Sequence, residues 1–120
     1  MTAKLIYICS PLRGDIEGNT QKAREYCRAI VELFPDAVPI APHLYCTQFL
    51  DDRIPEERAA GMDMALALLD KCDEVWVFSD RLSEGVLREI DYAVAHGIPV
   101  YDAAEQVRKL INEPSGRVRP

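Results

Sequence analysis

Residues 73–96, DEVWVFSDRLSEGVLREIDYAVAH, constrain the fold most, because they are typical of a buried strand that leads directly into an amphipathic helix. Residues 75–78 form a short run of apolar, β-branched and aromatic side chains, as a strand covered on both faces of a parallel sheet requires. Ser83 is a suitable helix N-cap, and Gly85 lets the backbone approach a ligand closely. At about 100° per residue, Glu89 lies at the edge of the helix's apolar stripe. We therefore predict a carboxylate above the end of a strand, where open α/β folds bind small molecules.

Strand and helix patterns alternate through the rest of the chain. Apolar runs predict further strands at 4–9, 37–41 and 98–101, and Pro39 places the second of these nearer a sheet edge. Helical spacing predicts three more helices. The first begins after a cap at Asn19 or Thr20 and ends before Pro35, the second covers 55–69, and the third covers 103–112. We predict one small α/β domain over residues 1–112, with a doubly wound parallel sheet of four or five strands in a three-layer, flavodoxin-like or Rossmann-like sandwich. A flexible tail is expected over 113–120.

The loops after the first three strands should meet at one rim, because parallel strands end at the same edge of a sheet. The segment 42–58 is expected to be a polar and aromatic loop at that rim. The predicted site residues there are Tyr7, Ser10, Arg13, Gly14, His43, Asp63, Asp80, Ser83, Gly85 and Glu89.

Charge and composition argue against several functions. The net charge of −6 opposes polynucleotide binding, which depends on neutralising backbone phosphates. Neither G-x-G-x-x-G nor G-x-x-x-x-G-K-[ST] occurs in the first loop, SPLRGD. The four cysteines show no zinc or disulfide spacing, so we expect reduced thiols, no metal and no cofactor. The apolar run after Lys4 is too short for a signal peptide or a membrane span, so a cytoplasmic location without membrane contact is expected.

Two motifs carry a resemblance to a known family. They are Y-x-C-x-x-x-R-G, at Tyr7, Cys9, Arg13 and Gly14, and S-x-G-x-x-x-E, which begins at Ser83 and ends at Glu89. Over roughly residues 4–101 the chain resembles the nucleoside 2-deoxyribosyltransferase superfamily, which includes the 2′-deoxynucleoside 5′-phosphate N-hydrolases.

The resemblance implies roles for the motif residues. Glu89 would attack the anomeric carbon of a (deoxy)ribosyl group, and Tyr7 would hold and orient its carboxylate. Arg13 and Gly14 would face the 5′ end, and Ser83 would hydrogen-bond the sugar or its phosphate. Cleavage of an N-glycosidic bond develops positive charge on the sugar, which an adjacent carboxylate stabilises or captures covalently. The resemblance also implies a small-molecule nucleoside or nucleotide as ligand, and a homodimer or larger homo-oligomer.

The chain departs from the family pattern at one position. In the characterised enzymes an aspartate lies eight residues before the residue equivalent to Asp73, where this chain has Ala65. Asp63, Asp80 and His43 are the candidates for the acid that protonates the leaving base. Two functions follow as hypotheses: a cleaving or transferring enzyme with a carboxylate nucleophile, and a non-catalytic nucleotide-binding module on the same scaffold.

Overall fold

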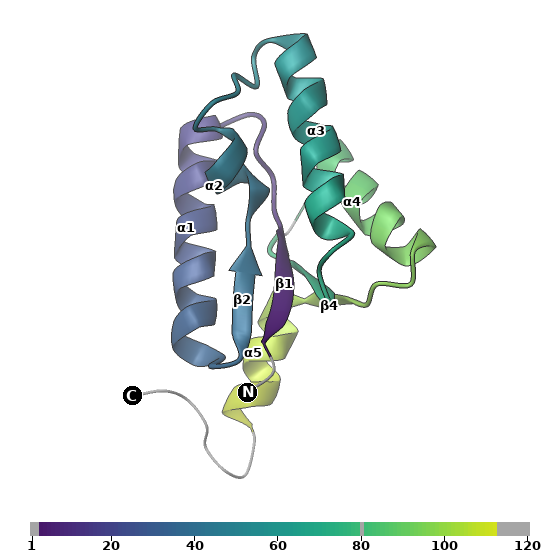
Figure 1. The fold of residues 1–120 in the computed structure, drawn as a ribbon. Helices are drawn as coiled ribbons and strands as arrows, with labels where there is room; N and C mark the ends of the chain where they lie inside the picture. The colour runs from purple at the N-terminus through teal and green to yellow at the C-terminus, as the bar shows by residue number, and fades with distance from the viewer. Residues whose placement is uncertain (1–2, 80, 113–120) are drawn as a thin grey trace.

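Four parallel strands and the helices around them make up the structure, a computed structural model that describes residues 3–79 and 81–112 (Figure 1). The strands are β1 Lys4–Cys9, β2 Ala37–Ile40, β3 Glu74–Val77 and β4 Val100–Asp102. The helices are α1 Ile16–Leu33, α2 Pro42–Cys46, α3 Pro55–Leu69, α4 Glu84–Ala95 and α5 Ala103–Ile111. The strand order is β2-β1-β3-β4, and all three neighbouring pairs are parallel. The predicted doubly wound α/β fold is confirmed.

Strand β1 runs through the middle of the sheet and divides the interior into two cores. Its side chains alternate between the two faces, as in any strand. Ile6 and Ile8 face the core beneath α1, whereas Tyr7 and Cys9 face the core formed with α3 and α4. Figure 1 shows α1 on one side of the sheet and α3 and α4 on the other. The alternation therefore directs Tyr7 and Cys9 toward the helix that carries Glu89.

Strand β2 lies at an edge of the sheet, as its proline predicted. It pairs only with β1 in the described part of the chain, and Pro39 stands opposite Ile6 in the register. Proline has no backbone N–H to donate, and an edge strand needs to satisfy a neighbour on one side only.

Helix α1 begins earlier than predicted, and the expected cap at Asn19 or Thr20 was wrong. Asp15 is the N-cap, because its side chain accepts a hydrogen bond from the Gly18 backbone N–H at 3.0 Å. The Asn19 amide instead donates to the Leu12 carbonyl at 3.1 Å, which ties the preceding loop to the first turn of α1. Aspartate and asparagine are equally good N-caps, so residue type alone did not distinguish Asp15 from Asn19, and the conformation of the loop places the cap at Asp15.

The remaining boundaries differ in detail. Residues 42–58 are not a loop throughout, because a short helix, α2, begins at Pro42, which is buried and fits a first helical turn. Strand β4 covers Val100–Asp102 instead of 98–101, because the Ile98 N–H donates to the Ala93 carbonyl at 2.9 Å and closes the end of α4. The tail predicted over 113–120 lies outside the described residues. Within 3–79 and 81–112, no helix is both long and apolar enough to cross a bilayer.

The Asp15 cap should stabilise the fold measurably. We expect Asp15→Ala to lower the free energy of unfolding by about 1 kcal/mol, because the Gly18 N–H loses its partner. Asp15→Asn keeps an acceptor oxygen and should remain close to the wild type. Urea denaturation followed by circular dichroism measures both, and equal losses in the two variants would contradict the assignment of the cap.

Candidate active site

A cavity of about 410 Å³ lies at the carboxyl end of β1. Its walls come from the β1–α1 loop, α2, α3 and the start of α4. The strand order changes direction between β1 and β3, and α/β folds bind ligands where this happens. Of the predicted site residues, Ser10, Arg13, Gly14, His43, Ser83, Gly85 and Glu89 line the cavity.

Tyr7 and Glu89 meet at the inner end of this cavity. The Tyr7 side chain is fully buried on β1, and its hydroxyl donates to Glu89 Oε2 at 2.5 Å. Glu89 is half-buried on α4 and lines the cavity. The phenol therefore holds the carboxylate from the protein side, while a ligand can approach it from the cavity.

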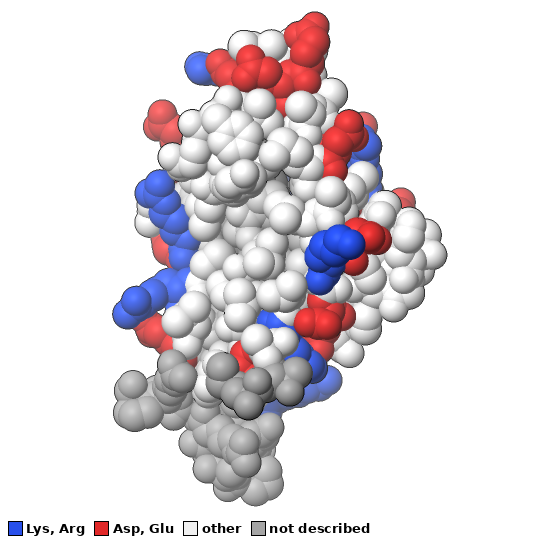
Figure 2. All heavy atoms as spheres, viewed as in Figure 1, with Lys and Arg blue, Asp and Glu red and all other residues white. Residues whose placement is uncertain are grey.

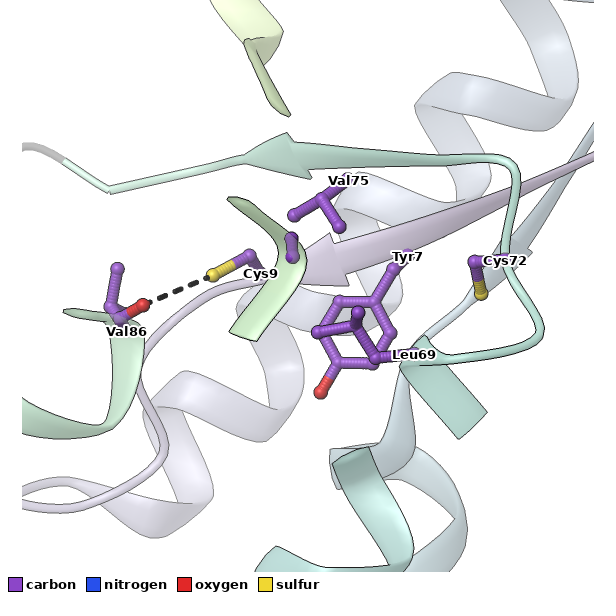
Figure 3. Close-up of a cluster of buried hydrophobic side chains, with 7 residues drawn as sticks. Tyr7, Cys9, Leu69, Cys72, Val75 and Val86 are labelled. Atoms are coloured by element: carbon purple, nitrogen blue, oxygen red, sulfur yellow. Dashed lines mark hydrogen bonds between the residues drawn. The ribbon is translucent and has the colours of Figure 1, made fainter. Parts of the chain in front are cut away.

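Cys9 supplies a second donor to the same carboxylate. Its Sγ lies 3.4 Å from Glu89 Oε1 and 3.8 Å from the Val86 carbonyl oxygen. Figure 3 shows Tyr7 beside Leu69 and the Cys9 thiol directed at Val86. From the sequence, Cys9 was expected to be a motif residue and a buried thiol, but it was not predicted to donate a hydrogen bond to Glu89. The signal was present, because Cys9 follows Tyr7 by two residues and shares its face of the strand.

Burial dominates the electrostatics of this cluster. It raises the pKa of Glu89 from its ordinary value of 4.5 to about 7, although the hydrogen bonds from Tyr7 and Cys9 favour the ionised form and lower it. Burial, together with the charge of Glu89, raises the pKa of the Tyr7 hydroxyl and of the Cys9 thiol. Both groups therefore keep their protons and remain donors, while the carboxylate is the member that titrates near neutral pH.

His43 and Ser10 form a second polar pair on the cavity wall. The Nε2 atom of His43 lies 2.7 Å from the Ser10 carbonyl oxygen, which can only accept, so Nε2 carries the hydrogen. Burial lowers the pKa of His43, which keeps the ring neutral near pH 7. The Ser10 side chain is buried, and its Oγ has no hydrogen-bond partner among the described residues. A buried hydroxyl in this condition is a candidate ligand contact.

Arg13 and Gly14 lie where two hollows meet. Both line the 410 Å³ cavity and also a wider hollow of about 890 Å³ on the α1 and α5 side. Gly14 has φ +97°, a conformation that glycine adopts without steric cost. Arg13 is exposed, so its guanidinium can reach a ligand in either hollow.

Ser83 and Gly85 begin helix α4. The Ser83 hydroxyl accepts a hydrogen bond from the Val86 N–H at 3.3 Å, which confirms the predicted N-cap and leaves the hydroxyl hydrogen for a ligand. Gly85 is exposed at the cavity, and an added Cβ would meet nothing within 4 Å. Steric contact with the rest of the protein therefore does not require glycine at position 85.

The structure does not bring all the predicted residues together. Asp63 is exposed on α3 and is not among the residues that line the cavity. Ala65, which is 6% exposed, lines it instead. Asp80 lies outside the described residues. Within 3–79 and 81–112, no group of three or more His, Cys, Asp and Glu side chains is arranged to hold a metal ion.

Sequence reasoning also missed acidic residues around the cavity. Asp52, Glu57 and Glu84 line it together with Arg58 and Arg88. Asp52, Glu57 and Arg58 belong to a stretch, DDRIPEER, whose composition alone is typical of a solvated surface. Their position became clear only with the path of the chain from α2 to α3.

Comparisons with known proteins relate the chain to one family and one fold. The model of the family described as "Domain of unknown function (DUF7768)" matches residues 4–103. No curated protein matches significantly. Among solved structures, a 2-deoxyribosyltransferase from the psychrotolerant bacterium Bacillus psychrosaccharolyticus is similar at 13% identity and a TM-score of 0.66, over 97% of this chain and 98% of that one. A conserved protein from Enterococcus faecalis V583 is similar at 18% identity and a TM-score of 0.58, over 98% of this chain and 80% of that one. At these identities the likeness shows the shared fold.

Glu89 should make folding stability depend on pH. Its pKa is 4.5 ordinarily and about 7 in the fold, so between these values the folded state holds one more proton than the unfolded chain. The contribution of Glu89 to the free energy of unfolding is fully present below pH 4.5 and falls as the pH rises toward 7. The wild type should lose up to about 3 kcal/mol of unfolding free energy across this window relative to Glu89→Gln. Urea titrations at half-unit pH steps measure the difference.

Tyr7→Phe is the companion variant. It removes a hydrogen bond that lowers the pKa of Glu89, so the falling part of the stability curve should extend to higher pH. If the curves of unfolding free energy against pH were parallel for the wild type and Glu89→Gln, the carboxyl group would titrate at its ordinary pKa. That result would contradict the burial of Glu89 beside Tyr7.

Proposed function

The chain belongs to the DUF7768 family, and we propose that it cleaves or transfers at the N-glycosidic bond of a nucleoside or nucleoside 5′-monophosphate, with Glu89 as the nucleophile. One observation carries this proposal: a half-buried carboxylate faces a sugar-sized cavity and is held by a fully buried phenol at 2.5 Å. A surface glutamate with a structural role would need neither the cavity nor the buried donor.

The chemistry follows from the position of the carboxylate. As the bond between C1′ and the base nitrogen breaks, positive charge develops on the sugar, and the free face of Glu89 can form a bond to C1′. Water, or a second base, then displaces the carboxylate from C1′. The first acceptor gives hydrolysis and the second gives transfer, and both retain the configuration at C1′.

Tyr7 and Cys9 position the nucleophile in this scheme. One donor contacts each carboxylate oxygen, the hydroxyl at Oε2 and the thiol at Oε1. A carboxylate has about four acceptor positions, so two donors fix its orientation and leave lone pairs free to attack. The rigid strand β1 carries both donors, and rigid support of this kind is what a reaction between close atoms requires.

Arg13, Ser10 and Ser83 form a part of the cavity lining that fits a 5′ oxygen or phosphate. Arg13 lies in the loop above β1, Ser83 retains its hydroxyl hydrogen, and the buried Ser10 hydroxyl lacks a protein partner in the described part of the chain. An arginine fork and hydroxyl donors are the usual ligands of a phosphate. The shared fold with a 2-deoxyribosyltransferase, a protein that by its name acts on deoxyribosyl groups, supports the same ligand class.

A binding module without turnover is the second candidate. It is favoured by Ala65, because this buried residue lines the wall of α3 without offering a proton to a departing base. The two candidates predict the same ligands and differ only in the products.

Incubation with a panel of glycosides tests the proposal. The panel contains nucleosides and 5′-monophosphates of the natural bases and of positively charged bases, and chromatography follows the free base. We expect base release by the wild type and at least about a hundredfold less by Glu89→Gln, because the amide is a poor nucleophile. The rate should rise with pH up to about 7, where Glu89 ionises. Tight binding without release from any member of the panel would select the module.

Arg13→Ala tests the 5′ end. We expect the variant to weaken a nucleoside monophosphate by about 10- to 100-fold and the matching nucleoside far less, because a charge-assisted hydrogen bond to phosphate contributes about 1.5–3 kcal/mol. Arg24→Ala, an exposed arginine on α1 away from both hollows, is the matched control. Calorimetric titration measures both affinities, and equal losses for the monophosphate and the nucleoside would place the phosphate elsewhere.

A further inference from the structure

The wall of α3 beside the nucleophile is apolar. Met62, Ala65 and Leu66 line the cavity there, and Leu66 also packs against the cluster that contains Tyr7. None of these side chains has a proton to give. Resting on the function proposed above, we propose that the substrates of this site are N-glycosides whose leaving ring is already positively charged, such as pyridinium or N7-alkylated purine glycosides.

Bond balance explains why the charge of the ring matters. When the C1′–N bond breaks, its electron pair goes to the ring nitrogen. A neutral base becomes an anion unless an acid protonates it, whereas a cationic ring becomes a neutral molecule with no proton transfer. Glu89 forms the bond to C1′. Water then adds its oxygen to C1′, the pair of the C1′–carboxylate bond returns to Glu89, and one proton passes to solvent.

The acidic residues other than Glu89 on the cavity wall lie at or before the first turns of α3 and α4. Glu57 precedes Ala65 by eight residues on α3, about 12 Å along the helix axis, and helical side chains lean further toward the N-terminus. Its Oε1 accepts a hydrogen bond from the Asp51 N–H at 3.0 Å. Asp52 lies beyond it, before the helix begins. Glu84 is exposed in the first turn of α4, beside the Ser83 cap.

The donors near Glu89 already have acceptors. The Tyr7 hydroxyl and the Cys9 thiol contact the two oxygens of the nucleophile itself. The hydrogen on His43 Nε2 is directed to the Ser10 carbonyl. Among the residues that the structure describes, none that lines the cavity beside Glu89 is therefore placed as an acid for the leaving group.

Charge on the cavity lining favours the same ligand. Asp52 and Glu57 line the cavity at the start of α3, next to Arg58, and Figure 2 shows acidic side chains gathered over the start of α3 and the segment before it. Among the described residues, four acidic side chains (Asp52, Glu57, Glu84 and Glu89) and three arginines (Arg13, Arg58 and Arg88) line the cavity, so the acidic excess of one charge gives a small preference for a cationic ring. An uncharged base gains nothing from this excess.

Matched pairs of glycosides test the inference. The probes are 7-methylguanosine with guanosine, and nicotinamide riboside with uridine, in ribo and 2′-deoxyribo forms, with each enzymatic kcat/KM divided by the uncatalysed rate of the same compound. Because general acid catalysis contributes about 10²–10⁴-fold, we expect the acceleration of the cationic member to exceed that of its neutral partner by at least about 100-fold. Equal acceleration of both members would overturn the inference and leave the proposed function intact. Acceleration of neither would overturn both.

A variant of the wall gives a second readout. Ala65→Asp places a carboxyl group on the apolar wall and should raise the acceleration of guanosine by about tenfold or more relative to Ala65→Asn, which has the same shape and no dissociable proton. Release from 7-methylguanosine shows that both variants are folded. A gain on guanosine that is as large in Ala65→Asn would contradict the assignment that the described residues beside Glu89 include no acid.

Discussion

The hydrogen bond between the Tyr7 hydroxyl and the Glu89 carboxylate is the contact on which the site depends. Burying an ionised carboxylate is costly, and here the cost is only partly offset, because two donors compensate the charge while the pKa still rises to about 7. The fold tolerates this because β1, β3 and α4 pack around the pair, with Val75 from β3 and Val86 from α4 in the same buried cluster as Tyr7. A carboxylate that is costly to ionise is also poorly solvated, and in the proposed reaction it would respond more readily to a developing positive charge.

The parallel sheet makes this contact possible. Tyr7 and Cys9 lie near the carboxyl end of β1, and the crossover from β3 begins α4 at the same edge, so Glu89 arrives above them one and a half turns into the helix. Helix α3 approaches from the other crossover and closes the cavity with small and apolar side chains. The topology that brings Tyr7, Cys9 and Glu89 together therefore also sets the opposite wall of the cavity, through a helix, α3, that supplies none of these three residues.

Much of this arrangement could be predicted from residue patterns, and the rest depended on the path of the loops. The run at 75–78, the Ser83 cap and the alternation along β1 are local features, so they predicted the fold and directed attention to Glu89. The Asp15 cap and helix α2 were missed because several residues in each loop satisfy the same local preferences. Asp63 was a candidate for the acid that protonates the leaving base because Ala65 replaces the family's aspartate, yet Asp63 is exposed and Ala65 lines the cavity.

The charge of the ligand and the ionisation of Glu89 are coupled. Near pH 7 the free carboxyl group is close to half protonated, because burial opposes its charge. A cationic ring in the cavity would favour the ionised form and lower the pKa of Glu89, as an opposite charge nearby does for any carboxyl group. Binding of such a ligand would then generate the active nucleophile, whereas a neutral base would add burial without charge and raise the pKa further. The two unusual features of the site, a half-buried carboxylate and an apolar wall on α3, would thus act together in the proposed preference for a positively charged glycoside.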